Sequence, residues 1–128
     1  MKYVLVLTVF TLLACRSLTY PPEEVQSSIV GTWSMVSDSE PHVFRMVKAD
    51  SFTTFVRGFQ FHEDGKVVIY GPWGCQMPPS FREYSGTWRV DKKGNVVVSA
   101  FAFSHVQAHW KILSLSSNEL RYITDLVL

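Results

Sequence analysis

Short runs of β-branched and aromatic residues, separated by turn residues, fill most of the chain after residue 29. In 59–70, apolar residues alternate on both sides of an Asp-Gly pair at 64–65, a pattern typical of a β-hairpin. Similar runs flank a Lys-Gly-Asn stretch at 93–95 and a Ser-Ser-Asn stretch at 116–118. Three hairpins with local turn chemistry predict an antiparallel, all-β chain.

The segment 42–59, HVFRMVKADSFTTFVRGF, fits two structures. Its phenylalanines at 52, 55 and 59 follow helical spacing, and Asp50 or Ser51 is a possible helix cap. The Thr-Thr-Phe-Val run at 53–56 favours a strand, and Lys-Ala-Asp-Ser at 48–51 is a natural turn. We predict two strands, HVFRMV and FTTFV, joined by this turn.

With a first strand at 31–37, the count reaches about eight strands in roughly a hundred residues. Closing an antiparallel sheet removes its exposed edges, so we predict an up-and-down barrel of about eight strands. The interior of such a barrel holds side chains or one small ligand. Before it, the prolines and glutamates of 19–28 suit a tether followed by one short helical turn.

The first residues predict export and a lipid anchor. Lys2 precedes an apolar run from Tyr3 to Ala14, as in a secretory signal, and the run is too short to span a bilayer. It ends in Leu-Leu-Ala-Cys at 12–15, which resembles the bacterial lipoprotein box, whose cysteine is acylated before cleavage. The alternative is an ordinary cleaved signal. The lipoprotein interpretation divides the chain into a signal peptide (1–14), a lipidated tether with the helical turn (15–28) and the barrel (29–128).

Composition excludes one class of partner. Without residues 1–14, the twelve Lys and Arg become eleven, because Lys2 is lost, against eleven Asp and Glu. Nucleic acid is not an expected partner, since phosphate binding needs clustered basic charge. Cys75 is then the only cysteine of the barrel, so it has no intramolecular disulfide partner. It is either buried and inert or a reactive thiol.

The tripeptide Gly-Thr-Trp occurs twice, at 31–33 and 86–88. Glycine lets a strand enter the barrel without a Cβ clash, and Trp33 or Trp88 can plug an end. A duplication is the alternative, because DGKVVIY and KGNVVVS are also alike. The two copies stand at different distances from their turns, however, which favours two strands entering the barrel under one constraint.

The chain resembles, in patches over 29–128, the lipocalin-like domains of the small bacterial lipoprotein type. The resemblance rests on the two tripeptides, the signal and the ending WKILSLSSNEL at 110–120. The resemblance implies a structural role for Gly31, Trp33, Gly86 and Trp88. It also implies that Arg121 lies over the Trp33 ring. Other lipocalin signatures are missing, which weakens the case for orthodox ligand transport.

The sequence gives little support for catalysis or metal binding. We predict that the protein is not an enzyme and binds no metal and no cofactor. His105 and His109 are four residues apart, which in a strand is about 13 Å and too far to share one ion; the alternative is a turn that brings them together. Neither a His-Glu-x-x-His nor a Gly-x-Ser-x-Gly pattern occurs.

The candidate ligand residues come from two stretches. The first, 70–84, joins two strands by a long loop rich in apolar and soft side chains, suited to a lid, an adhesive patch or a cap over the barrel base. The second is the alternating run 97–105, in which either the phenylalanine face or the small-residue face points inward. The resulting candidates are Tyr70, Trp73, Met77, Phe81, Phe101, Phe103 and His105.

We therefore expect an envelope lipoprotein, anchored to the membrane through Cys15, whose barrel binds a small hydrophobic molecule. The alternative is an envelope module with a filled barrel that binds or inhibits another protein.

Overall fold

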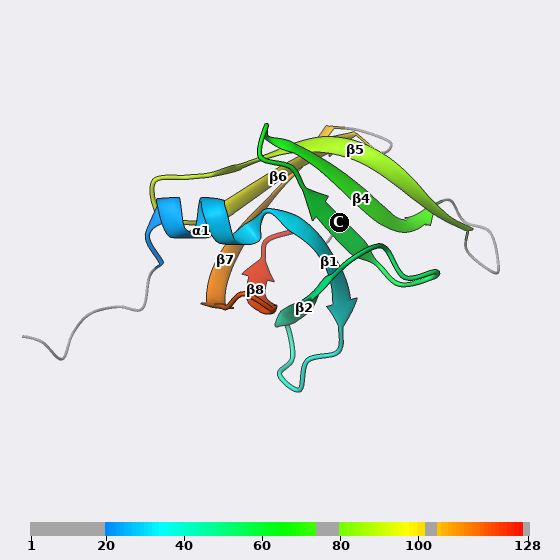
Figure 1. The fold of residues 1–128 in the computed structure, drawn as a ribbon, viewed down its shortest axis with the longest axis horizontal. Helices are drawn as coiled ribbons and strands as arrows, with labels where there is room; N and C mark the ends of the chain where they lie inside the picture. The colour runs from blue at the N-terminus through cyan, green and yellow to red at the C-terminus, as the bar shows by residue number, and fades with distance from the viewer. Residues whose placement is uncertain (1–19, 74–79, 102–104, 127–128) are drawn as a thin grey trace, which may run out of the picture.

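A computed structural model of the protein describes residues 20–73, 80–101 and 105–126. One helix is followed by eight strands, and Figure 1 shows them in chain order from blue to red. Their bounds are α1 Pro22–Ile29, β1 Gly31–Val36, β2 Phe44–Ala49, β3 Gly58–Phe61, β4 Lys66–Trp73, β5 Ser80–Val90, β6 Val96–Phe101, β7 His105–Leu115 and β8 Glu119–Thr124. Every paired strand is antiparallel and the sheet is closed, so the predicted all-β barrel of eight strands is confirmed.

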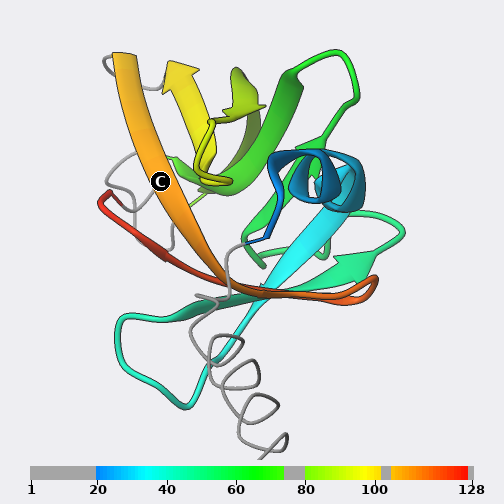
Figure 2. The same cartoon turned by 90° about the vertical axis from the view of Figure 1, so that its left-hand side faces the viewer.

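The strand order around the barrel is β1-β2-β8-β7-β6-β5-β4-β3. Strands β3 to β8 follow one another as a meander, and Figure 2 shows how they wrap around to meet β2. Strand β1 lies between β2 and β3, pairing with both. The segment 50–57 therefore has to cross β1 to connect its two neighbours.

Residues 50–57 are where the strand prediction was wrong. The first predicted strand is present as β2, but FTTFV at 52–56 forms bends and turns, with Phe55 at φ 61°, and β3 begins only at Gly58. The physical reason is external packing. The Phe52 ring lies where a Cβ of Gly58 would be and stacks on Tyr70 at 5.3 Å between ring centroids.

The three predicted hairpin turns are confirmed. Gly65 and Gly94 have φ of 88° and 84°, which L side chains rarely adopt. In each turn an aspartate closes the loop: Asp64 accepts from the Lys66 amide at 3.0 Å, and Asp91 accepts from the Asn95 amide at 2.9 Å. Between β7 and β8 the Ser116 hydroxyl accepts from the Glu119 amide at 3.0 Å.

Helix α1 is longer than the single turn predicted, and it closes one end of the barrel. Proline begins it and two glutamates lie in its first turn, where they complement the helix dipole. Val25 and Ile29 are fully buried in the core. The Trp33 indole N–H donates to the Ile29 carbonyl at 2.8 Å, which satisfies a carbonyl at the helix C-terminus.

The expectation that Arg121 covers Trp33 is wrong. The cation over that ring is Lys48, with Nζ 4.5 Å from the ring centroid and 2.6 Å from the Val30 carbonyl oxygen, to which it donates. Lys48 pairs directly with Trp33 across β1 and β2, so both side chains point to the same face. Arg121 instead donates to Asp38 at 2.9 Å.

The tryptophans of the two Gly-Thr-Trp copies have the same role in the core, but the copies lie at different places along their strands. Gly31 opens β1 with φ 127°, whereas Gly86 lies inside β5, which begins at Ser80, so the second copy does not open a strand as predicted. Trp88, like Trp33, is buried and donates its indole N–H to a backbone carbonyl, that of His62, at 2.8 Å. The common requirement is a buried indole with a satisfied donor.

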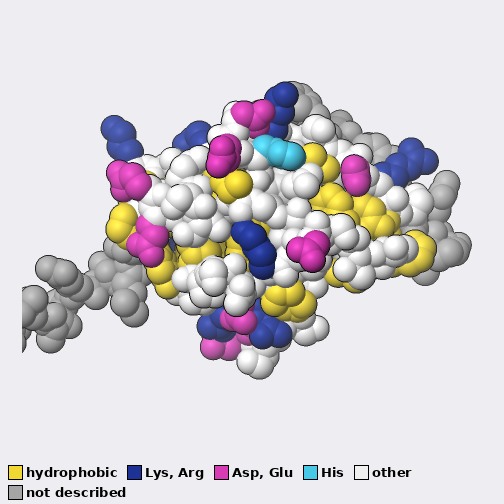
Figure 3. Space-filling view, in the orientation of Figure 1, with side chains coloured by type: hydrophobic (Ala, Val, Ile, Leu, Met, Phe, Trp, Pro, Cys, Tyr) yellow, Lys and Arg dark blue, Asp and Glu magenta, His cyan; other side chains and the backbone are white. Residues whose placement is uncertain are grey.

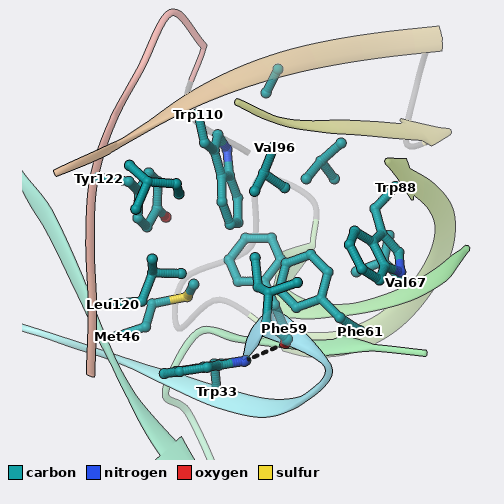
Figure 4. Packing of buried hydrophobic residues seen from close by; sticks show 14 of the residues in the cluster. Trp33, Met46, Phe59, Phe61, Val67, Trp88, Val96, Trp110, Leu120 and Tyr122 are labelled. Carbon is teal, nitrogen blue, oxygen red and sulfur yellow. Dashed lines mark hydrogen bonds between the residues drawn. The ribbon is translucent and has the colours of Figure 1, made fainter. Parts of the chain in front are cut away.

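Aromatic side chains fill the middle of the barrel (Figure 4). Trp110 meets Phe59 edge to face at 4.9 Å and stacks on Tyr122 at 4.1 Å, and Phe61 meets Trp88 edge to face at 5.3 Å. Geometries of this kind stabilise a core beyond the area they bury. The middle of the barrel is therefore occupied by the protein's own side chains.

A candidate ligand site at the far end of the barrel

The two ends of the barrel differ. Strand β1 starts beside α1, so its last residues, the start of β2 and the end of β8 lie at the opposite end, here called the far end. Antiparallel pairing places the ends of β4 and β6 and the starts of β5 and β7 there too.

A pocket of about 100 Å³ enters the barrel at the far end. Phe59 and Trp110 are buried, 3% and 1% exposed, whereas Leu126 at the rim is 41% exposed. The lining residues are Met35, Phe44, Arg57, Phe59, Trp110, Tyr122, Thr124 and Leu126. Drug-sized ligands occupy pockets of about 300–1,000 Å³, and a cavity of about 150 Å³ holds benzene. This pocket therefore admits a small molecule or the end of a larger one.

Two polar groups stand out in this apolar lining. Among the described residues that line the pocket, Arg57 is the one cationic side chain, and its backbone carbonyl accepts from the Met35 amide at 2.8 Å. The Tyr122 side chain is 3% exposed, and its hydroxyl donates to the Met35 sulfur at 3.7 Å. A thioether is a weak acceptor, so this phenol makes a weak hydrogen bond in a buried place.

The positive charge of Arg57 affects the pKa of two phenols at this end of the barrel. Burial raises the pKa of Tyr122, and the positive charge of Arg57 acts in the opposite direction. The pKa of Tyr84 responds in the same way, raised by burial and opposed by Arg57. Both phenols consequently stay protonated at neutral pH and remain hydrogen-bond donors.

Tyr70 and Phe81, both predicted ligand residues, lie together on the outside of the barrel and do not line the pocket. With Phe52 and Phe55 they form a group here called the outer aromatic cluster. The Tyr70 ring is 5.4 Å from Phe81, the Phe55 ring is 5.6 Å from Phe81, and the Phe55 amide donates to the Tyr70 hydroxyl at 3.2 Å. Phe55 is 69% exposed. Figure 3 shows hydrophobic side chains gathered over β4 on this face.

The long loop predicted at 70–84 is shorter in the structure, because β4 continues to Trp73 and β5 begins at Ser80. The Trp73 backbone ends β4, and Phe101 pairs with His105 at the far end of β6 and β7. The side chains of these three residues lie outside the described part, as do Cys15, Cys75, Met77 and Phe103 altogether.

For the described part of the run 97–105, strand β6 shows which face points into the barrel. Val96, Val98 and Ala100 belong to the core, so the small-residue face of this strand points inward. Ala100 stands opposite Gly86 and Val98 stands opposite Ala108. Small side chains on three neighbouring strands thus leave room for the large rings of Phe59 and Trp110.

Arg121 forms an ion pair on the outside of the far end. Its Nε lies 2.9 Å from Asp38 Oδ2, and its Nη2 lies 3.3 Å from Glu40 Oε1. The hydrogen bond from Arg121 lowers the pKa of Asp38 from 3.8 to about 2. Because the pair ties the β1–β2 connection to β8, Arg121 has a structural role, although a different one from that expected.

The described residues contain neither a metal-binding cluster nor a membrane-spanning helix. No three His, Cys, Asp or Glu side chains of 20–73, 80–101 and 105–126 lie close enough together to hold a metal ion. Over the same residues, no helix has the length and hydrophobicity needed to cross a membrane.

Sequence reasoning missed most of the pocket. Arg57 had one usable signal, a lone cation in the apolar run Phe-Val-Arg-Gly-Phe at 55–59. Met35, Phe44 and Tyr122 look like ordinary strand residues, and only barrel closure brings them together. Comparisons with protein-family models, with curated proteins and with solved structures each found no match for this chain.

Proposed function

We propose that this protein is a lipocalin-like envelope lipoprotein, exported and anchored through Cys15, whose barrel binds a small, mostly apolar molecule at its far end. The observation that carries the proposal is the pocket itself. It is apolar at its base, with one cation and one buried phenol among its lining residues. A mainly apolar concavity with a few convergent polar groups is the usual form of a small-molecule site.

The place of Tyr20, where the described chain begins, agrees with this arrangement. The Tyr20 hydroxyl accepts from the amide of Leu115, at the end of β7 beside α1. Cys15 lies five positions before Tyr20 in the sequence, a distance that a chain spans with at most about 17 Å at roughly 3.5 Å per residue. A lipid on Cys15 would hold the helix end close to the membrane and leave the pocket end facing away, accessible to molecules in solution.

Binding is tested by native mass spectrometry of the purified protein before and after denaturation. A reproducible mass excess that disappears on denaturation is expected. Met35→Phe should reduce the occupied fraction, because it adds a ring to the pocket wall. Val68→Phe is the matched control, because Val68 is half-buried between the core residues Val67 and Ile69 and is not a lining residue. Equal occupancy in both variants would remove the pocket from the proposal.

The anchor is tested separately. Cys15→Ser should move the protein from the membrane fraction to the soluble fraction and abolish incorporation of labelled fatty acid. Retention of the label in the variant would refute lipidation at this residue.

A second candidate is an envelope module that binds another protein and carries no ligand. The outer aromatic cluster favours it, because Phe55 is 69% exposed on a group of four aromatic rings. Aromatic residues are enriched where proteins bind one another. A bare mass even after exposure to small-molecule extracts, with capture of an envelope protein that is lost in Phe55→Ser, would favour this function.

A further inference from the structure

The segment 50–57, here called the strap, joins β2 to β3 by crossing β1 on the outside of the barrel, and its path can be followed between these strands in Figure 1. It forms bends and turns instead of pairing as a strand. Three features of the strap and of the strand below it indicate a segment that opens while the rest of the barrel stays folded. This inference does not depend on ligand binding at the far end.

The first feature is a buried hydroxyl below the strap. Ser34 on β1 is 8% exposed, and its Oγ has no hydrogen-bond partner among the described residues. Its neighbours Trp33 and Met35 point into the barrel, so Ser34 points outward. Gly58 stands directly opposite Ser34, and the Phe52 ring of the strap occupies the position of a Gly58 Cβ. The strap therefore lies over the strand face that carries this hydroxyl, and its departure would let the hydroxyl bind water.

The second feature is backbone strain inside the strap. Phe55 has φ 61°, in the left-handed region, where a residue with a Cβ is strained. Its side chain is 69% exposed, so burial of the ring does little to offset this strain. Such strain persists only where the surroundings impose it, and it is common in segments that switch between two positions. Opening the strap would relieve the strain at Phe55 and hydrate the Ser34 hydroxyl together.

The third feature is the way in which the strap is fastened. The Phe52 ring stacks on Tyr70 at 5.3 Å between ring centroids, and the Phe55 amide donates to the Tyr70 hydroxyl at 3.2 Å. The Val56 amide donates within the strap, to the Thr53 carbonyl at 3.0 Å. A single side chain of β4 thus holds the strap both through its ring and through its hydroxyl.

We propose that the strap is a displaceable cover, which opens as one unit between the end of β2 and the start of β3 while the barrel stays closed. In the open position the Ser34 hydroxyl is hydrated, and the two strap rings leave Tyr70 and Phe81. The position of the strap thereby decides whether the outer aromatic cluster is assembled. It acts as a switch for the surface that the second candidate function would use.

The test measures the accessibility of a thiol placed below the strap. Ser34→Cys puts a side chain of similar size at this position, and Val98→Cys is the matched control, because Val98 is fully buried in the barrel core. The full-length variants are treated with iodoacetamide under native conditions, and labelling at each position is followed by peptide mass spectrometry. Ser34→Cys should be labelled at least about 10-fold faster than Val98→Cys, because local opening needs less free energy than global unfolding.

Urea below the unfolding transition separates the two routes of exposure. Global unfolding exposes a large surface, so labelling of Val98→Cys should rise steeply with the urea concentration. Opening of the strap exposes little surface, so labelling of Ser34→Cys should change far less. Equal labelling rates with the same urea dependence would mean that the strap leaves only when the whole barrel unfolds, and would overturn the proposal.

A second substitution shows whether the strap controls the exposure. Tyr70→Phe keeps the ring and removes the hydroxyl that accepts from the Phe55 amide, and it should raise the labelling rate of Ser34→Cys about 5-fold, as expected for one neutral hydrogen bond. Tyr20→Phe is the matched control, because it removes a phenol that accepts from the Leu115 amide at the same distance of 3.2 Å, away from the strap. A rate that Tyr70→Phe leaves unchanged, or that Tyr20→Phe raises equally, would also refute the proposal.

Hydrogen exchange of the unaltered protein gives a check that needs no variant. The Phe55 and Val56 amides have different acceptors, a side chain of β4 and a carbonyl of the strap itself. If the strap opens as one unit, both amides should exchange with the same protection factor, below that of the Val98 amide. Protection factors that differ by more than about 10-fold between the two strap amides would show that the strap does not open as a unit.

Discussion

Two glycines on neighbouring strands should respond in opposite ways to the same substitution. Gly86 on β5 and Gly71 on β4 both lie where the backbone is outside the left-handed region. A Cβ at Gly86 would come closer than 3.0 Å to the Ser99 carbonyl oxygen, and would also lie 3.1 Å from the Ala100 Cα. A Cβ at Gly71 would meet nothing within 4 Å.

The magnitude follows from what has to move. The atoms facing Gly86 are backbone atoms of β6, held by the hydrogen-bonded ladder with β5, so they cannot rotate away as a flexible side chain can. Overpacking typically costs 1–3 kcal/mol, and we expect Gly86→Ala to lower the free energy of unfolding by about 3 kcal/mol. Gly71→Ala should be neutral or stabilise by about 0.5–1 kcal/mol, because alanine restricts the unfolded chain.

Urea unfolding followed by tryptophan fluorescence measures both variants against the unaltered protein. For a chain of this length, about 3 kcal/mol corresponds to a fall in melting temperature of roughly 10 °C. If Gly86→Ala loses less than about 1 kcal/mol, or if the two variants behave alike, then β5 and β6 do not approach each other as closely as the geometry requires.

Four further substitutions test the packing around the barrel ends. Trp33→Phe removes the donor to the Ile29 carbonyl and part of a buried ring, and it should lower the free energy of unfolding in urea by about 2–4 kcal/mol. A loss under about 1 kcal/mol would contradict the role of that hydrogen bond. Lys48→Met keeps the methylene stem and removes the ammonium over the Trp33 ring, and it should lower the free energy of unfolding by about 1 kcal/mol. Arg121→Met should leave the emission of Trp33 unchanged, because Arg121 binds Asp38 instead. Because Arg121 holds the pKa of Asp38 at about 2, below its ordinary 3.8, this carboxylate stabilises the fold fully above about pH 4 and loses its contribution as the pH falls toward 2. Arg121→Gln should therefore weaken the acid dependence of unfolding between pH 4 and 2, and an unchanged dependence would refute the assignment.

The barrel itself could be predicted from the sequence because its determinants are local. A turn such as Asp64-Gly65 needs only a glycine at positive φ and a carboxylate within two residues, both visible in the chain. Once three hairpins are assigned, the alternation of apolar residues implies one buried face, and a closed sheet follows from the number of strands.

The local signals failed where a side chain packs against a distant strand. Phe52 belongs to a β-prone run, yet its ring covers Gly58 and stacks on Tyr70, so the chain turns instead of extending. The cation over Trp33 is likewise decided by register, because Lys48 stands directly opposite that residue across β1 and β2. Neither contact can be predicted from the residues that neighbour it in the sequence.

The sequence by itself determined the class of fold, its turns and the absence of an obvious catalytic motif, since each depends on residues close together in the chain. Only the tertiary structure decided which side chains share the far end of the barrel. Arg57, Tyr122 and Met35 come from three strands or their edges and meet because β1 lies between β2 and β3 and the sheet closes. A binding site assembled across a closed sheet depends on strand order and register, and these are properties of the whole barrel.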